Sequence, residues 1–336
     1  MDSINIRQLA VELNLSVGTV SKALKDSYEI SAETKRRVTE MALRLNYIPN
    51  PYASSLRRRK SKTIAVVIPE VADSFFSLAI NGIDAVARNK GYHVLIYLTH
   101  ESFEREQTIL NECKSGRIDG LLISVTKETT DYQHICDLQQ NGVPIVAFDR
   151  VAEDVNIAKV TTNDFESGYL AASHLIEKGC KRIAYLSLSK NLSITNQRME
   201  GYRQALVNYS IAMNENDTVF CTMDDAGNQQ LIEDLLSRSN HPDGIIISVE
   251  KLILPVYDAC HNLNLSIPSK VKVISFCNLP SARILNPSLT TITQPAFEMG
   301  ETAAELLFKG LEKRNFILKE ESMTIPSILN ERESTL

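Results

Sequence analysis

Residues 15–24, LSVGTVSKAL, place hydroxyl-bearing and cationic side chains between apolar ones, close to the start of the chain. Thr19, Ser21 and Lys22 carry hydroxyl donors and a positive charge, which suit contacts with DNA phosphates or base edges. Val17 and Gly18 are small enough to let a helix approach the bases closely. The alternative is a solvated amphipathic helix pair, which is frequent in helical proteins, and periodicity alone does not decide between the two.

Three short helices must position this stretch. Apolar residues at i, i+3, i+4 and i+7 predict a first helix whose buried face is Ile6, Leu9, Ala10 and Leu13. Ser16 is a suitable N-cap for a second helix, in which Val17, Val20 and Leu24 are expected to point inward. Ser31 is a suitable N-cap for a third helix, buried through Val38, Met41, Ala42 and Leu45. Three such helices, with a tight turn after the first, are typical of a helix-turn-helix unit.

Charge is divided unevenly along the chain. Residues 1–62 carry twelve Lys and Arg against six Asp and Glu, a net charge of +6. The whole chain stands at −5, so the remainder stands at −11. A basic head on an acidic body indicates that only the head meets a polyanion.

A second cationic segment, NYIPNPYASSLRRRKSK, follows the three helices. Asn50 is a potential N-cap and Pro51 stands at the first helical position, where proline is favoured. The predicted helix, roughly 51–58, is too short to persist alone in water and would become ordered when phosphates bind. Leu56 is suited to wedging into a minor-groove base step. A charged interdomain linker is the alternative, and both descriptions can hold.

The N-terminal region closely resembles that of the LacI/GalR family of bacterial transcription regulators. The resemblance is carried by LSVGTVSKAL, ISAETKRRV, LNYIPNPYASSL and TIAVVIP. It implies that residues 17, 18 and 22 face the bases, and that a hinge helix at 50–57 inserts Leu56 between central base pairs of the operator. The predicted DNA-binding residues are Ser16, Val17, Gly18, Thr19, Ser21, Lys22, Lys25, Tyr47, Asn50, Ala53, Leu56 and Arg57. The family often has Arg at 22 and Asn at 25, so these two lysines are expected to change which operator is read.

Beyond residue 62, apolar runs alternate with helical patterns in two successive series. The predicted strands are 63–69, 93–99, 120–124 and 143–149, then 182–187, 218–221, 244–248 and 271–276. The predicted helices are 75–90, 103–115 and 130–141, then 165–178, 196–208, 226–238 and 252–263. This predicts an α/β fold with two lobes, each built on a parallel sheet, and a small-molecule cleft between the carboxyl ends of their strands.

The family resemblance extends through this body, for example in DGLLIS, VPIVAFDR, RMEGYRQAL and PSLTTITQPAFEMGETAAELL. It implies a periplasmic-binding-protein-like ligand domain in which the chain crosses between lobes three times. The expected organisation is a helix-turn-helix domain at 1–49 and a hinge helix and linker at 50–61. The N-terminal lobe is expected at 62–160 with 293–320, and the C-terminal lobe at 161–292 with 321–334.

The resemblance also implies which residues face an effector. They are Asp73, Phe75, Phe76, Asp149, Arg150, Asn163, Arg198, Val249, Cys277 and Gln294. Aromatic faces stack on the C–H surfaces of sugars, while Asp and Arg side chains bind hydroxyls. The alternatives are that Phe75 and Phe76 belong to the core at the start of a helix, and that Asp149 and Arg198 form structural ion pairs.

Two departures from the family pattern bear on the effector. Cys277 stands where many members have Asp, and Val249 stands where Asn is common. A less acidic pocket leads to the hypothesis of an anionic sugar acid or sugar phosphate held by Arg150 and Arg198. The alternative is that Asn278 takes over the polar role.

Other classes of protein find little support in the sequence. It contains no GxSxG, HExxH, GxxxxGK[ST] or GxGxxG motif, and its six histidines and six cysteines lack metal-ligand spacing. We therefore expect no enzyme, no metal and no cofactor. The N-terminus lacks the pattern of a signal peptide, and no apolar run approaches the roughly 20 residues that span a bilayer, so a cytoplasmic protein without a membrane partner is expected.

The sequence thus predicts a DNA-binding repressor whose affinity for a pseudo-palindromic duplex operator is controlled by a sugar-like effector. No long leucine-heptad tail follows LNEREST, so a homodimer is expected rather than a tetramer. The alternatives are a periplasmic-type sugar-binding protein, for which the basic head would have no use, and an effector-independent DNA binder, for which the cleft would have none.

Overall fold

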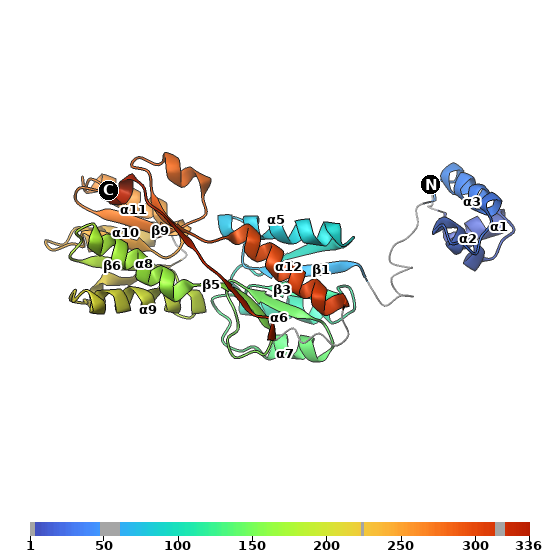
Figure 1. Cartoon of the computed structure of the whole chain (residues 1–336), viewed down its shortest axis with the longest axis horizontal. Coiled ribbons are helices and arrows are strands. Elements are labelled where there is room, and N and C mark those ends of the chain that lie inside the picture. Colours follow the sequence, from blue (N-terminus) through green and yellow to red (C-terminus); the bar gives the residue numbers. More distant parts are fainter. Residues whose placement is uncertain (1–3, 48–60, 223–224, 313–319) are drawn as a thin grey trace. The chain divides into compact units, whose positions relative to one another are not determined.

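The computed structural model describes residues 4–47, 61–222, 225–312 and 320–336 (Figure 1). The chain divides into two compact units, Met1–Ser61 and Lys62–Leu336. They are called the head and the body below, and each is described by itself. Along the part of the chain that is described, no helix combines the length and the apolar character needed to cross a membrane.

The head contains the three predicted helices: α1 (Ile6–Glu12), α2 (Val17–Leu24) and α3 (Ala32–Arg44). The predicted N-caps of α2 and α3 are confirmed, since Ser16 accepts a hydrogen bond from the Thr19 amide and Ser31 accepts one from the Thr34 amide. Asn14 adopts a left-handed backbone conformation between α1 and α2, with φ of 53°. This residue makes the tight turn of the helix-turn-helix unit.

A small apolar cluster holds the head together, centred on Leu9, Val20 and Val38, each fully buried. The prediction that Val17 points inward is wrong, because 39% of this residue is exposed. Val17 is the first residue of α2, whereas the residues that α2 buries are Val20 and Ala23. The first turn of α2 therefore presents an apolar side chain to solvent.

The first lobe of the body is built on a six-stranded parallel sheet in the order β11-β5-β4-β3-β1-β2. Its strands are β1 (Thr63–Ile68), β2 (His93–Leu98), β3 (Gly120–Ile123), β4 (Ile145–Phe148), β5 (Ala158–Thr162) and β11 (Met323–Ile325). Its helices are α5 (Ser74–Asn89), α6 (Phe103–Cys113), α7 (Gln133–Gln140) and α12 (Ala296–Glu312).

Helices cover both faces of this sheet, as parallel strands require. In β1, Ile64, Val66 and Ile68 pack in the core under α5 and α12, which lie side by side (Figure 1). Ala65 and Val67, which alternate with them, pack in the core under α6 and α7. Strand β1 is therefore apolar and buried from Ile64 to Ile68, which is why its sequence predicts a buried strand.

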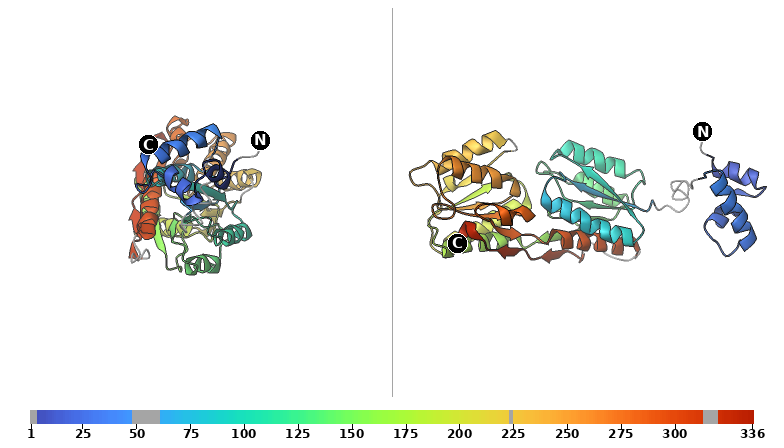
Figure 2. Two further views of the ribbon diagram at one scale, coloured as in Figure 1. Left: turned by 90° about the vertical axis from the view of Figure 1, so that its right-hand side faces the viewer. Right: turned by 90° about the horizontal axis from the view of Figure 1, so that it is seen from above.

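The second lobe repeats this architecture with the strand order β12-β10-β9-β8-β6-β7, in which only the β10–β12 pair is antiparallel. Its strands are β6 (Ile183–Ser187), β7 (Thr218–Phe220), β8 (Gly244–Ile247), β9 (Lys272–Phe276), β10 (Thr290–Thr293) and β12 (Ile328–Asn330). Its helices are α8 (Asp164–Glu177), α9 (Ser193–Asn208), α10 (Asp225–Leu236) and α11 (Ile253–Asn262). One core lies under α8 and α9 and another under α10 and α11. Figure 2 shows the two lobes of the body side by side.

The chain passes between the lobes at three places: after β5, after β10 and after β11. The last segment differs from the predicted boundaries. The segment 321–334 was expected in the C-terminal lobe, yet β11 pairs with β5 in the first sheet and only β12 pairs with β10 in the second (Figure 1). The reason is that each sheet ends in an edge strand with free backbone groups, and one extended segment supplies a hydrogen-bonding partner to both.

Candidate effector pocket and DNA-binding surface

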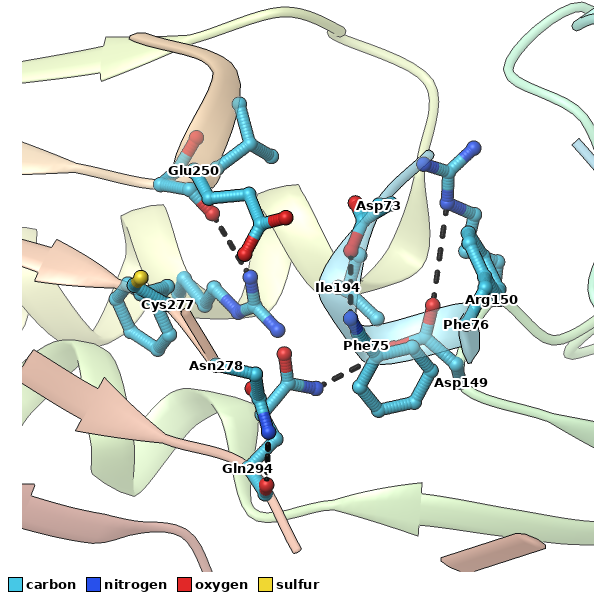
Figure 3. A pocket seen from close by; sticks show the side chains of 14 residues that line it. Asp73, Phe75, Phe76, Asp149, Arg150, Ile194, Glu250, Cys277, Asn278 and Gln294 are labelled. Carbon is cyan, nitrogen blue, oxygen red and sulfur yellow. Dashed lines mark hydrogen bonds and ion pairs between the residues drawn. The ribbon is translucent and has the colours of Figure 1, made fainter. Parts of the chain in front are cut away.

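One cavity between the lobes brings together nine of the ten residues predicted to face an effector (Figure 3). Its empty volume is about 380 Å³, counted with the part that is open to solvent. The lining residues are Asp73, Phe75, Phe76, Asp149, Arg150, Ile194, Arg198, Ser248, Val249, Glu250, Phe276, Cys277, Asn278 and Gln294. Most of them follow the carboxyl ends of parallel strands, where ligands of α/β proteins bind.

Asn163 is the one predicted residue that does not line this cavity. Its Oδ1 accepts hydrogen bonds from the Ser327 amide at 2.8 Å and from Ser167 Oγ at 3.1 Å. These contacts join the segment after β5 to the segment after β11, where the chain crosses between the lobes. The structure therefore places Asn163 at the crossing between the lobes, outside the lining of the cavity.

The N-terminus of α5 forms one side of the pocket. Asp73 caps the helix by accepting a hydrogen bond from the Phe75 amide at 2.9 Å. Glu250 reaches it from the second lobe and accepts hydrogen bonds from the Ser74 amide at 2.7 Å and from Ser74 Oγ. Burial, together with the negative charge of Glu250, raises the pKa of Asp73 to about 7.

Asp149 and Arg150 lie at the end of β4, where Asp149 has a left-handed φ of 60°. Arg150 Nη1 donates to Glu101 Oε1 at 2.7 Å, and its guanidinium lies over the Phe76 ring at 5.5 Å. Burial raises the pKa of Asp149 to about 6, although the positive charge of Arg150 opposes the effect. Gln294 Nε2 donates to Asp149 Oδ1 at 3.3 Å, which links a first-lobe carboxylate to the segment after β10.

Arg198 is almost fully buried on α9, with 2% of the residue exposed. Its Nε donates to Asp164 Oδ1 at 2.6 Å, its Nη1 donates to the Ser248 carbonyl at 2.9 Å, and its guanidinium lies 4.2 Å from the centre of the Phe276 ring. Its Nη2 is buried without a hydrogen-bond partner. This nitrogen is a donor available to a bound molecule.

A close approach of two helices positions the Arg198–Asp164 pair. A Cβ added to Gly168 on α8 would lie 2.0 Å from the carbonyl oxygen of Arg198, and one added to Gly201 on α9 would lie 1.9 Å from the carbonyl oxygen of Phe165. Only glycine permits this backbone contact. It brings the first turn of α8, with Asp164, within reach of the arginine on α9.

The two alternatives weighed from the sequence both hold in part. Phe75 and Phe76 line the pocket, but they are only 5% and 1% exposed and belong to the core under α5 and α12. Arg198 lines the pocket and is also engaged in a structural ion pair with Asp164. These side chains therefore set the shape of the pocket through contacts that also stabilise the fold.

The hypothesis of an anionic effector held by Arg150 and Arg198 is not supported. Each arginine already pairs with a carboxylate outside the lining, Glu101 or Asp164. The sequence analysis did not predict Glu250. Its carboxylate gives the pocket a negative charge, which the neutral Cys277 does not supply at the position where many family members have Asp. The position of Glu250, two residues after the predicted strand 244–248, was the available signal.

The remaining polar positions agree with a compact pocket. Cys277 is buried, and burial raises the pKa of its thiol to about 12, so the side chain is a neutral thiol. Asn278 lines the pocket, as its alternative role requires, and its Nδ2 donates to the Gln294 carbonyl at 2.6 Å. Ile194, Ser248 and Phe276 were not predicted. They carry no motif, since an isoleucine, a serine and a phenylalanine near element ends are common in any α/β sequence.

The head presents the predicted DNA-binding residues at and around α2. Ser16, Val17, Gly18, Lys22 and Lys25 are exposed. Lys22 forms an ion pair with Glu29, and both side chains remain about half exposed. Three further predicted residues are partly buried: Thr19, Ser21 and Tyr47. Four lie outside the described residues: Asn50, Ala53, Leu56 and Arg57.

Comparison with known proteins decides the family. Residues 5–50 match the profile described as "Bacterial regulatory proteins, lacI family", and residues 172–335 match a "Periplasmic binding protein-like domain". The chain is 30% identical over 330 residues to the ribose operon repressor of Halalkalibacterium halodurans, which covers 98% of this chain and 96% of that protein. The chain belongs to the LacI family of bacterial regulatory proteins. It is a DNA-binding transcription regulator of that family.

Solved structures of this family share the fold. The lac repressor dimer bound to operator and the anti-inducer ONPF aligns over 100% of both chains, with a TM-score of 0.85 and 21% identity. A LacI family transcriptional regulator from Enterococcus faecium with bound ribose covers 81% of this chain and 98% of its own, with a TM-score of 0.70 and 25% identity. The helix-turn-helix head and the two-lobed α/β body are thus the architecture of the LacI family.

Proposed function

We propose that this LacI-family regulator is a repressor that binds a pseudo-palindromic operator as a homodimer. In this proposal a polyhydroxylated, sugar-like effector occupies the pocket between the lobes and changes the affinity for the operator. The convergence of nine predicted residues in a single cavity between the lobes carries the proposal. The protein acts as a regulator in the cytoplasm, without catalysis.

The chemistry of the pocket suits a polyol. Asp149, Glu250 and Gln294 offer oxygen acceptors for hydroxyl groups, and the unpartnered Nη2 of Arg198 offers a donor. The rings of Phe75, Phe76 and Phe276 give the apolar surface on which the C–H face of a sugar packs. The ribose operon repressor among its relatives and the Enterococcus faecium regulator with bound ribose support an effector of this class.

Effector binding would act through the relative arrangement of the lobes. The pocket takes Asp73, Asp149 and Arg150 from the first lobe and Arg198 and Glu250 from the second. A molecule that contacts both sides stabilises one arrangement of the lobes over others. Because binding free energies are reciprocal, DNA and effector then change each other's affinity by the same factor.

The head would read the operator with α2 in the major groove. We assign Val17, Gly18 and Lys22 to the base edges, and Ser16, Thr19, Ser21, Lys25 and Tyr47 to surrounding phosphate or base contacts. The segment 50–61 would supply the hinge helix with Asn50, Ala53, Leu56 and Arg57. The lac repressor dimer bound to operator supports a dimer that places two heads on two half-sites.

A gel-shift titration tests this function. The full-length protein is incubated with the DNA upstream of its own gene at increasing salt, with and without a panel of pentoses, hexoses and disaccharides. We expect one specific complex that is sensitive to salt. At least one sugar should change the protein concentration at half-maximal binding tenfold or more. A specific complex that no sugar moves would favour the effector-independent binder, and the absence of any specific complex would refute the operator-binding proposal.

A further inference from the structure

The pocket holds more carboxylates than available cations. Among the fourteen lining residues, all of them described, the acids are Asp73, Asp149 and Glu250 and the cations are Arg150 and Arg198. Both arginines are already paired with acids behind the lining: Arg150 with Glu101 at 2.7 Å, and Arg198 with Asp164 at 2.6 Å. Asp149 Oδ2 lies 3.9 Å from Arg150 Nε, so of the three lining carboxylates only Asp73 and Glu250 face the cavity without an ion pair among the described residues.

Two of these carboxylates face each other from opposite lobes. Asp73 caps α5 in the first lobe, and Glu250 extends from the segment after β8 in the second lobe to the same helix end (Figure 3). Glu250 accepts from the Ser74 amide and hydroxyl, and Asp73 accepts from the Phe75 amide. A carboxylate has about four acceptor sites, so each retains oxygen lone pairs for a further donor.

Closing the lobes around this pair has an electrostatic cost. The pKa of Asp73 rises to about 7 because of burial and of the Glu250 charge, and burial raises the pKa of Asp149 to about 6. Ionised carboxylates in a pocket of low polarity repel each other unless a proton or another cation lies between them. A bound cation would turn this repulsion into attraction between the lobes.

A second observation points to hydroxyl groups on the same ligand. Arg198 is almost fully buried, and its Nη2 has no hydrogen-bond partner although it belongs to a pocket-lining side chain. A buried guanidinium donor requires an oxygen acceptor. Carboxylate acceptors on one side and an arginine donor on the other fit a polyol that also bears a positive charge.

We infer that the effector is an amino sugar whose ammonium group lies between Asp73 and Glu250 and whose hydroxyl oxygens accept from Arg198. This inference rests on the proposed function, because it names the chemical class of the effector for the same pocket. The ammonium group bridges the lobes, so its binding favours the closed arrangement. Ser74 keeps Glu250 oriented toward the end of α5.

Matched sugars test this inference in the full-length protein. The probes are D-glucosamine, D-galactosamine and D-mannosamine, each with its neutral parent hexose and its N-acetyl derivative, in thermal-shift and calorimetric titrations at pH 7. We expect at least one amino sugar to raise Tm and to bind at least tenfold more tightly than both of its uncharged analogues. N-acetylation keeps the ring and its hydroxyls but removes the charge, so it isolates the ammonium group.

Two variants locate the charge. We expect Asp73→Asn and Glu250→Gln each to reduce the affinity for the amino sugar at least tenfold more than the affinity for its N-acetyl derivative. Glu305→Gln, an exposed position on α12 outside the pocket, is the matched control and should change neither affinity. If a variant fails to fold, the comparison of amino sugar with N-acetyl sugar in the unaltered protein still decides.

Three other outcomes would contradict either the amino-sugar inference or the proposed function. Equal or tighter binding of neutral hexoses overturns the amino-sugar inference and leaves the proposed function standing. Amino-sugar binding that both pocket variants retain overturns the assignment to Asp73 and Glu250. If none of these hexoses or their derivatives binds, and no pentose or disaccharide changes the operator affinity in the gel shift, the proposed sugar-like effector is itself refuted.

Discussion

The head and the body use charged side chains in opposite ways. In the head, Lys22 and Lys25 lie exposed around α2, where water and salt screen them. In the body, Arg150 and Arg198 are 8% and 2% exposed, and each is held by a carboxylate and stacked on a phenylalanine ring. Exposed charge gives salt-dependent attraction to a polyanion, whereas buried charge gives recognition that depends on geometry.

The strongest test of this contrast is Arg198→Met. Removing the guanidinium leaves Asp164 buried without its cation, so we expect a loss of about 3–5 kcal/mol in the free energy of unfolding of the body. Chemical denaturation at low and high salt measures the loss, which should change little with salt. Arg203→Met on the same helix, where the side chain is 40% exposed, is the control and should cost far less. Equal losses for the two variants would contradict the buried-pair argument.

The pH dependence of Asp73 gives the next largest effect. Its pKa of about 7 in the folded protein lies above the ordinary 3.8, so its stabilising contribution is complete below about pH 3.8 and is lost as pH rises toward 7. A difference of about three pKa units corresponds to at most about 4 kcal/mol. The charges of Glu250 and Asp149 raise the pKa of this carboxyl group further, and the charge of Arg150 lowers it.

Asp73→Asn tests the effect of the Asp73 charge alone, because asparagine also caps the helix but carries no charge. We expect the variant to have a higher Tm than the unaltered protein at pH 8 and nearly the same Tm at pH 4. Thermal denaturation across this pH range checks the result. A constant difference between the two proteins at all pH values would show that the charge of Asp73 is not the cause.

A smaller effect is expected from the cap of α2. Ser16→Ala removes the acceptor for the Thr19 amide and should destabilise the head by about 1 kcal/mol. Amide hydrogen exchange in the head measures this loss, and the exchange of β1 and β6 in the body should stay unchanged because the two units have separate cores. Ser16→Asp, which restores a cap, should recover the protection.

The smallest expected effect is that of a single exposed lysine. If Lys25 contacts a phosphate, and not a base as the family pattern implies, Lys25→Ala should weaken operator and nonoperator binding by similar factors and lower the slope of log affinity against log salt by about 0.9. Binding titrations from 50 to 200 mM salt, the range in which phosphate contacts are usually resolved, measure the slope. A change of operator preference without a change of slope would instead assign Lys25 to base recognition.

Local sequence patterns, apolar periodicity together with N-caps, were enough to predict the three helices of the head and most of the helices and strands of the body. The caps at Ser16 and Ser31 act within one helical turn, and the strands β1, β3, β4, β6, β8 and β9 are buried on both faces, so each leaves a continuous apolar run. The strands β5 and β10 were missed because they contain AKVTT and TTIT, where threonine and lysine interrupt that run.

The tertiary structure decided what depends on contacts between distant segments. Pairing of β11 with β5 is set by an open sheet edge about 160 residues earlier in the chain. Glu250 enters the pocket because it meets Ser74 on the opposite lobe, and Arg198 is committed to Asp164 because glycines let α8 and α9 touch. The local sequence pattern determines which helix or strand a residue belongs to. The net charge of the pocket depends on residues from both lobes, and only the folded chain brings these residues together.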